Sequence, residues 1–144
     1  MREIKFRAWD KENKKMWYNV QKAYDNLGSF CKHNNIEDYD LLDICDCKDE
    51  EKYTNKMGSF DSVLDDKTLV VMQYTNLKDK NGKEIYEGDK LHNPNDKELY
   101  YEVFWDEKEG AWSLGDDGTN LAKYGLNEFW EVIGNIYENQ ELIK

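Results

Sequence analysis

The sequence predicts an α+β protein that is mainly β, with a small SH3-like antiparallel β-barrel in its C-terminal half. An N-terminal β-hairpin and short helices are expected to pack on this barrel. Three features lead to the prediction: strand-like segments at short spacing, polar turns between them, and alternating apolar and polar residues near the N-terminus. A chain of 144 residues can bury a modest core without covalent cross-links.

The first predicted segment, residues 1–66, begins with a hairpin. Apolar and basic residues alternate over residues 4–9, which is typical of a strand, and residues 16–18 resume as its partner. Helical spacing of apolar residues predicts a short helix over residues 20–27. A second short helix is expected from Ser59 through Leu64, where a serine can cap the first turn.

The second predicted segment, residues 67–144, carries the barrel, and a single integrated domain is the alternative. Asn81-Gly82 is the strongest turn signal of the chain, and Gly134 allows the last strand to coil sharply. Leu121 to Phe129 is expected to be a short helix or irregular. After an entry strand over 69–74, the predicted barrel strands are 84–91, 99–105, 111–115 and 131–137.

Charge is unevenly distributed along the chain, whose formal net charge is −11. Residues 1–58 hold 11 basic and 12 acidic groups, whereas residues 59–144 hold 9 basic and 19 acidic groups, a net charge of −10. Such an anionic surface repels phosphate backbones, so direct nucleic-acid binding is disfavoured. The basic residues within 2–15 could still contact phosphate, or the acidic half of another copy of the chain.

The cysteines indicate reduced thiols rather than disulfides or a metal centre. Cys31, Cys45 and Cys47 form no C-x-x-C pair, and adding His33 matches no standard zinc spacing. The acidic residues of segment 29–58 lack the calcium-loop register. We therefore expect no cofactor and no metal. Since no apolar run could span a membrane and no signal peptide is visible, a cytoplasmic protein without a membrane partner is expected.

Three stretches resemble one known family. Residues 1–16, residues 72–90 and residues 132–139 are similar to the opening, the central signature and the ending of the YopX family of phage and prophage proteins. Members usually carry Gly where Asn76 stands here, and Asn also tolerates a positive φ. The resemblance implies a small accessory protein acting inside an infected or lysogenic bacterial host. It supplies no catalytic residue.

Candidate binding residues come from two regions. Segment 74–89 either specifies the fold or presents a ligand surface, with Lys78, Asp79 and Lys80 on an exposed loop. The hairpin around Trp105 is rich in aromatic residues. Alternation sends one set of side chains to one face and a second set to the other, namely Leu99, Tyr101, Val103 and Trp105 against Tyr100, Glu102 and Phe104. One set fills the barrel, and the second covers the N-terminal hairpin and helix or another subunit. The candidate binding residues are Tyr74, Lys78, Asp79, Tyr86, Tyr100, Phe104 and Trp112.

Catalysis is poorly supported, so a non-enzymatic protein is expected. His33 and His92 are the only histidines, and no nucleophile elbow or phosphate-binding loop is present. An acid–base pair of carboxylates would be sought first among Glu102, Asp106, Glu107 and Glu109. A solvated hairpin loop explains these residues more simply.

Two functions of different classes follow. The first is a binding module that engages a host or phage protein, or further copies of itself as a homo-oligomer. The alternative is an acidic nucleic-acid mimic that places the carboxylates of residues 79–117 in a basic groove of a host protein. Mimicry requires these carboxylates at roughly phosphate spacing, ~7 Å or less.

Overall fold

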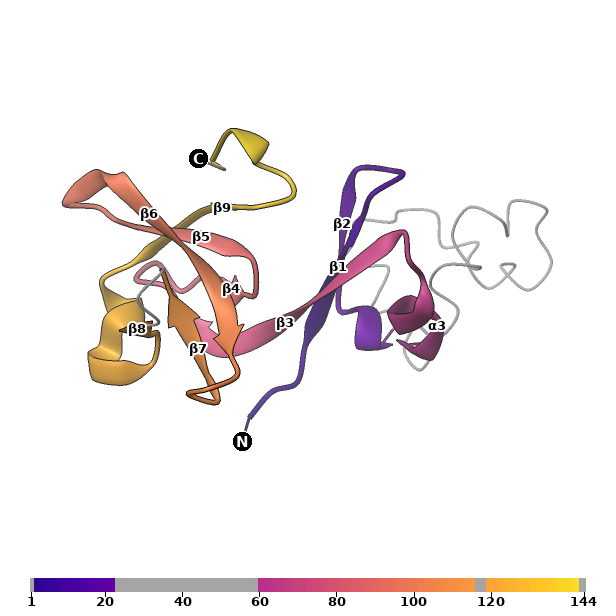
Figure 1. The fold of residues 1–144 in the computed structure, drawn as a ribbon, viewed down its shortest axis with the longest axis horizontal. Helices are drawn as coiled ribbons and strands as arrows, with labels where there is room; N and C mark the ends of the chain where they lie inside the picture. Colours follow the sequence, from indigo (N-terminus) through magenta and orange to yellow (C-terminus); the bar gives the residue numbers. More distant parts are fainter. Residues whose placement is uncertain (1, 23–59, 116–118, 143–144) are drawn as a thin grey trace. The chain divides into compact units, whose positions relative to one another are not determined.

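The computed structural model describes residues 2–22, 60–115 and 119–142 (Figure 1). Within these ranges the chain is mainly β, with antiparallel strands and one short α-helix, as predicted. The chain divides into two compact units. One is Lys5–Val71, and the other joins Met1–Ile4 to Met72–Lys144. The SH3-like assignment and the predicted division into 1–66 and 67–144 stay predictions.

The N-terminal unit is built on an antiparallel strand pair. Strands β1 and β2 pair from Arg7 opposite Tyr18 to Asp10 opposite Lys15. Of the helix predicted over 20–27, the described residues form only a 3₁₀ turn, and the remainder lies outside the described ranges. The helix predicted near Ser59 is observed as α3. The elements are β1 (Phe6–Asp10), β2 (Lys15–Tyr18), η1 (Val20–Lys22), α3 (Phe60–Asp65) and the start of β3 (Leu69–Lys78).

A small apolar cluster holds the N-terminal unit together, and a buried carboxylate shapes its turn. Asp10 is 1% exposed, and its Oδ1 accepts hydrogen bonds from the backbone N–H groups of Glu12 and Asn13. The backbone N–H of Lys11 donates to the carbonyl of Thr68, so the β1–β2 turn is tied to the chain entering β3. The buried cluster consists of Ala8, Trp17, Val20, Val63 and Leu69.

The C-terminal unit contains the remaining strands (Figure 1). Five of them form a sheet in the order β8-β7-β6-β5-β9, and β3 belongs to a second sheet of order β2-β1-β3-β4. The single strand predicted over 84–91 is two strands separated by a turn at Gly88. The elements are β4 (Glu84–Tyr86), β5 (Asp89–Asn93), β6 (Asp96–Asp106), β7 (Ala111–Leu114), β8 (Thr119–Asn120), η3 (Lys123–Glu128), β9 (Glu131–Asn135) and η4 (Gln140–Leu142).

One face of the five-stranded sheet forms the C-terminal core. Leu91 of β5 and Val103 of β6 are fully buried there, and the burial of Val103 fits the alternation predicted for its strand. The expectation that Trp105 also points into this core is wrong, because its side chain is 44% exposed. The core cluster consists of Ile85, Leu91, Val103, Trp112, Leu114, Leu121 and Val132.

Asn76 adopts the left-handed backbone conformation expected at this position, with φ of 66°. Its side-chain Oδ1 accepts a hydrogen bond of 2.7 Å from the backbone N–H of Glu3. The asparagine thus performs two tasks: it adopts a positive φ within β3, where the register with β4 shifts, and it anchors the start of the chain. Glycine could perform only the first of them.

Removing side-chain volume from the C-terminal core tests this description. Leu91→Ala should lower the free energy of unfolding by about 2–5 kcal/mol, because it deletes buried apolar contacts and leaves a cavity. Leu64→Ala is the control, since Leu64 is 54% exposed and its loss should change stability by no more than about 0.5 kcal/mol. Urea denaturation of both variants measures the difference. Equal effects would contradict the assignment of Leu91 to the core.

Candidate functional site

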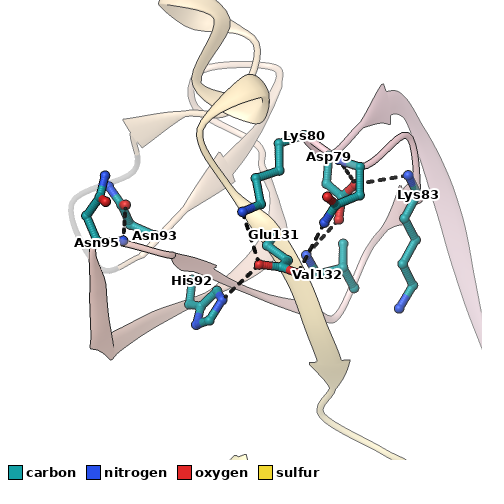
Figure 2. Close-up of polar contacts among 9 residues, drawn as sticks. Asp79, Lys80, Lys83, His92, Asn93, Asn95, Glu131 and Val132 are labelled. Carbon is teal, nitrogen blue, oxygen red and sulfur yellow. Dashed lines mark hydrogen bonds and ion pairs between the residues drawn. The ribbon is translucent and has the colours of Figure 1, made fainter.

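The loop between β3 and β4 is held by one carboxylate, that of Asp79. Its Oδ1 accepts hydrogen bonds from the backbone N–H groups of Asn81 (2.8 Å) and Lys83 (2.9 Å). Its Oδ2 accepts one from the backbone N–H of Val132 (2.9 Å), at the start of β9 (Figure 2). Asp79 is only 6% exposed, so the expectation that it lies on the loop surface is wrong. The loop is therefore pinned to β9.

Pinning the loop brings Lys80 and Asn81 onto the carboxylate of Glu131, which His92 of β5 also approaches. Asn81 Nδ2 donates to Oε1 at 3.1 Å, and Lys80 Nζ forms an ion pair with Oε2 at 3.4 Å. His92 Nε2 lies 3.4 Å from the same Oε2 (Figure 2). The backbone N–H of Lys80 also donates to the carbonyl of Trp130. We call Lys80, Asn81, His92 and Glu131 the Glu131 cluster.

Hydrogen bonding dominates the electrostatics of this cluster. The hydrogen bond from His92 lowers the pKa of Glu131 most, that from Lys80 adds to the effect, and desolvation opposes it. The side chain of Glu131 is 36% exposed and that of Lys80 34%, so solvent screens their ion pair. His92 is more enclosed, at 16%. The cluster is thus a solvated, preorganised polar surface rather than a buried reactive centre.

Strand register explains why sequence reasoning missed this cluster. His92 of β5 stands opposite Glu131 of β9 on one side and opposite Tyr100 of β6 on the other. Residues directly opposite each other in antiparallel strands share a face of the sheet. His92 and Glu131 are 39 residues apart in the chain. Only the pairing of the strands reveals their proximity, and no local sequence signal does.

Three of the predicted binding residues contribute to the packing of the C-terminal unit. Tyr74 and Tyr86 are each 4% exposed, stand opposite each other in β3 and β4, and have ring centroids 5.4 Å apart. The hydroxyl of Tyr86 donates to Glu84. Trp112 is buried in the core cluster. This burial fits the interpretation that much of segment 74–89 specifies the fold.

The other predicted binding residues are more accessible. Lys78 is exposed at the end of β3, whereas Tyr100 and Phe104 are half-buried on β6. Glu102 lies between these two and pairs with Lys90 of β5 at 3.2 Å. Together with His92 and Glu131, these β6 residues occupy the face of the sheet opposite Val103. This face was predicted for Tyr100, Glu102 and Phe104, whereas His92 and Glu131 were not predicted to lie on it.

Chemically, the Glu131 cluster offers charged and neutral hydrogen-bond donors around a carboxylate. It includes no hydroxyl or thiol nucleophile. Within the described ranges, no group of three or more His, Cys, Asp or Glu side chains could hold a metal ion. The residues weighed for zinc, Cys31, His33, Cys45 and Cys47, lie outside the described residues. No helix of the described chain is long and apolar enough to cross a membrane.

Acid titration tests the environment of Glu131. Because the folded state lowers its pKa below 4.5, the stability it contributes is fully present above that value and is lost as pH falls through the folded pKa. Glu131→Gln should therefore show a smaller loss of unfolding free energy than the wild type between about pH 6 and about pH 3. Glu109→Gln, which removes an exposed carboxylate, is the control and should follow the wild type. Parallel curves for Glu131→Gln and wild type would contradict the assignment.

Loss of the Asp79 carboxylate should destabilise the fold. Asp79→Ala leaves buried backbone donors without an acceptor, which costs about 1–3 kcal/mol per group left unsatisfied. Asp106→Ala is the control, since Asp106 also accepts from two backbone N–H groups but lies half-buried in a local turn. Only the Asp79 variant should accelerate hydrogen exchange at the Val132 amide. Unchanged exchange there would refute the tie between the loop and β9.

Comparison with known proteins agrees with the resemblance of the sequence motifs. The family model described as YopX protein matches residues 5–144. A search of curated proteins found no match. The crystal structure of protein EF1440 from Enterococcus faecalis is similar over 100% of both chains, with a TM-score of 0.60 and 22% sequence identity, a likeness of fold alone. With nearly its whole length matched, the chain belongs to the YopX family.

Proposed function

We propose that this YopX-family protein is a non-enzymatic phage or prophage accessory protein that binds a host or phage protein, or further copies of itself, in the bacterial cytoplasm. The observation that carries the proposal is the exposure of Phe129. Its side chain is 60% exposed, and it lies two residues before Glu131 in the chain. An exposed phenyl ring beside a fixed polar cluster is a suitable anchor for a protein partner.

The physical argument concerns the anatomy of protein interfaces. Aromatic side chains supply most of the apolar area at the centre of an interface, and hydrogen-bonding groups form its rim. Phe129 provides the apolar centre, and the Glu131 cluster provides the hydrogen-bonding rim. A partner that covers Phe129 removes apolar surface from water, at about 25 cal/mol per Å². Lys80, Asn81 and His92 offer donors at the rim.

Preorganisation strengthens the case for binding. The hydrogen bonds of Asp79 hold residues 79–83 in one conformation, and Lys80 is joined to β9 by both its backbone and its side chain. A surface ordered before binding loses little conformational entropy when the partner arrives. We propose an SH3-like barrel for the C-terminal half. Loop 79–83 and the segment before β9 would form the end of this barrel at which the partner binds.

The acidic nucleic-acid mimic is the second candidate, favoured by the net charge of −10 over residues 59–144. Glu107, Glu109 and Glu128 are exposed carboxylates of this part. Mimicry relies on charge attraction, so its binding must weaken steeply with salt. Binding through Phe129 relies on apolar area and must tolerate salt.

Affinity capture with the full chain as bait tests the proposal. Host and phage lysates are passed over the wild type, Phe129→Ala and Leu64→Ala, and each is washed at low and at high salt. Leu64 is the matched control, because it is an apolar side chain of similar exposure (54%) that also lies next to an acidic residue, Asp65. Sedimentation of the three chains measures self-association in parallel.

A partner, or an oligomer, that survives high salt and disappears with Phe129→Ala alone supports the proposal. Mimicry is supported instead if a nucleic-acid-binding protein is captured equally by the wild type and by Phe129→Ala and is lost at high salt. Equal losses with Phe129→Ala and Leu64→Ala would contradict the assignment of Phe129 as an anchor.

A further inference from the structure

The β6–β7 hairpin carries a large aromatic side chain that the core leaves in solvent. Trp105 stands opposite Trp112, on the same sheet face as Val103 and Leu114. Those three neighbours are 9%, 0% and 3% exposed, whereas Trp105 is 44% exposed. The core therefore ends at Trp112, and Trp105 extends the same face into solvent at the tip of the hairpin.

Trp105 is nevertheless held in place. Its ring packs edge-to-face against Trp112, with centroids 5.1 Å apart and an angle of 71° between the ring planes. Because Trp112 is buried, it acts as a fixed wall for its neighbour. Trp105 thus combines a packed contact with Trp112 and an open surface, since 44% of its area is accessible to water.

The turn that follows Trp105 is also preformed. Asp106 Oδ1 accepts from the backbone N–H groups of Lys108 (2.9 Å) and Glu109 (3.2 Å), and its carbonyl accepts from the N–H of Gly110 (2.8 Å). Gly110 has a φ of 61°, which glycine adopts without strain. The carboxylate of Asp106 is thus occupied in shaping the turn, which leaves Glu107 and Glu109 as its outward-facing anions.

Glu107 and Glu109 are exposed, and neither side chain has a hydrogen bond or ion pair to any described residue. Lys108 between them is exposed as well, so the tip from Asp106 to Glu109 carries a net charge of −2. An exposed indole followed in the chain by two carboxylates without a partner among the described residues suits one chemical group above others. A Lys or Arg side chain can stack on the ring while its charge meets a carboxylate.

We propose that Trp105, Glu107 and Glu109 form a docking site for a lysine- or arginine-bearing segment of another protein. The net charge of −11 makes two copies of the chain repel each other, so a second copy fits the site less well than a cationic partner. The inference rests on the proposed binding function, adding the chemistry of the partner at a site separate from Phe129 in the chain.

Nuclear magnetic resonance titration with an oligoarginine peptide tests the site, with oligoglutamine as the uncharged comparison. The indole N–H signal of Trp105 should shift on addition of oligoarginine alone. Trp105→Ala should weaken binding about fivefold, the equivalent of about 1 kcal/mol of cation–π attraction. Trp105→Phe should retain part of the affinity and shows that the hairpin still folds.

The double variant Glu107→Gln/Glu109→Gln should weaken binding and reduce its dependence on salt. Glu128→Gln/Glu141→Gln removes the same charge from exposed positions elsewhere and is the matched control. Equal weakening by both double variants would mean diffuse attraction to an acidic protein and would overturn the site. An oligomer of the chain that Trp105→Ala dissolves would identify a second copy as occupant and would also overturn it.

This design separates the two proposals. Salt-resistant capture that depends on Phe129, together with no response of Trp105 to oligoarginine, would leave the proposed function standing and remove the cationic site. A response of Trp105 that survives Phe129→Ala would support the cationic site whatever the capture experiment finds.

Discussion

The loop between β3 and β4 and the start of β9 both depend on one buried carboxylate, that of Asp79. Asp79 closes its own loop through the amides of Asn81 and Lys83, and it also accepts the amide of Val132. An acceptor with two oxygens can satisfy several donors at once, which no apolar side chain could do. The positions of Lys80 and Asn81 around Glu131 follow from this arrangement. The polar surface is thus a product of the hydrogen bonding that stabilises the fold.

The aromatic side chains of the C-terminal unit fall into a buried group that packs in the fold and an exposed group at its surface. Tyr74, Tyr86 and Trp112 are buried and pack against other side chains of the unit. Trp105 and Phe129 lie just beyond the packed region, each at the end of a regular element. The two sites are chemically different, since one has donors around it and the other has carboxylates.

Local chemistry made much of the β architecture predictable. Runs of β-branched and aromatic residues between polar turns located β3, β6, β7 and β9, and the positive φ of Asn76 fits the glycine that family members usually carry there. Two features were beyond local reasoning. The burial of Asp79 depends on an amide 53 residues away, and the His92–Glu131 contact depends on strand register. Trp105 was misjudged because alternation gives the face of a strand but not the point along it at which the core ends.

Strand β3 has a consequence for the order in which the chain can fold. Its first residue, Leu69, completes the apolar cluster of β1 and β2, and its Tyr74 pairs with Tyr86 only a short loop away. During synthesis, β1 and β2 leave the ribosome long before β3, so the N-terminal cluster stays incomplete until residue 69 has emerged. Bringing Leu69 back to β1 and β2 joins parts of the chain that are far apart in sequence, and this costs more chain entropy than forming the β3–β4 hairpin. The N-terminal cluster therefore cannot be completed before β3 is synthesised, and by then the C-terminal unit can already begin to fold.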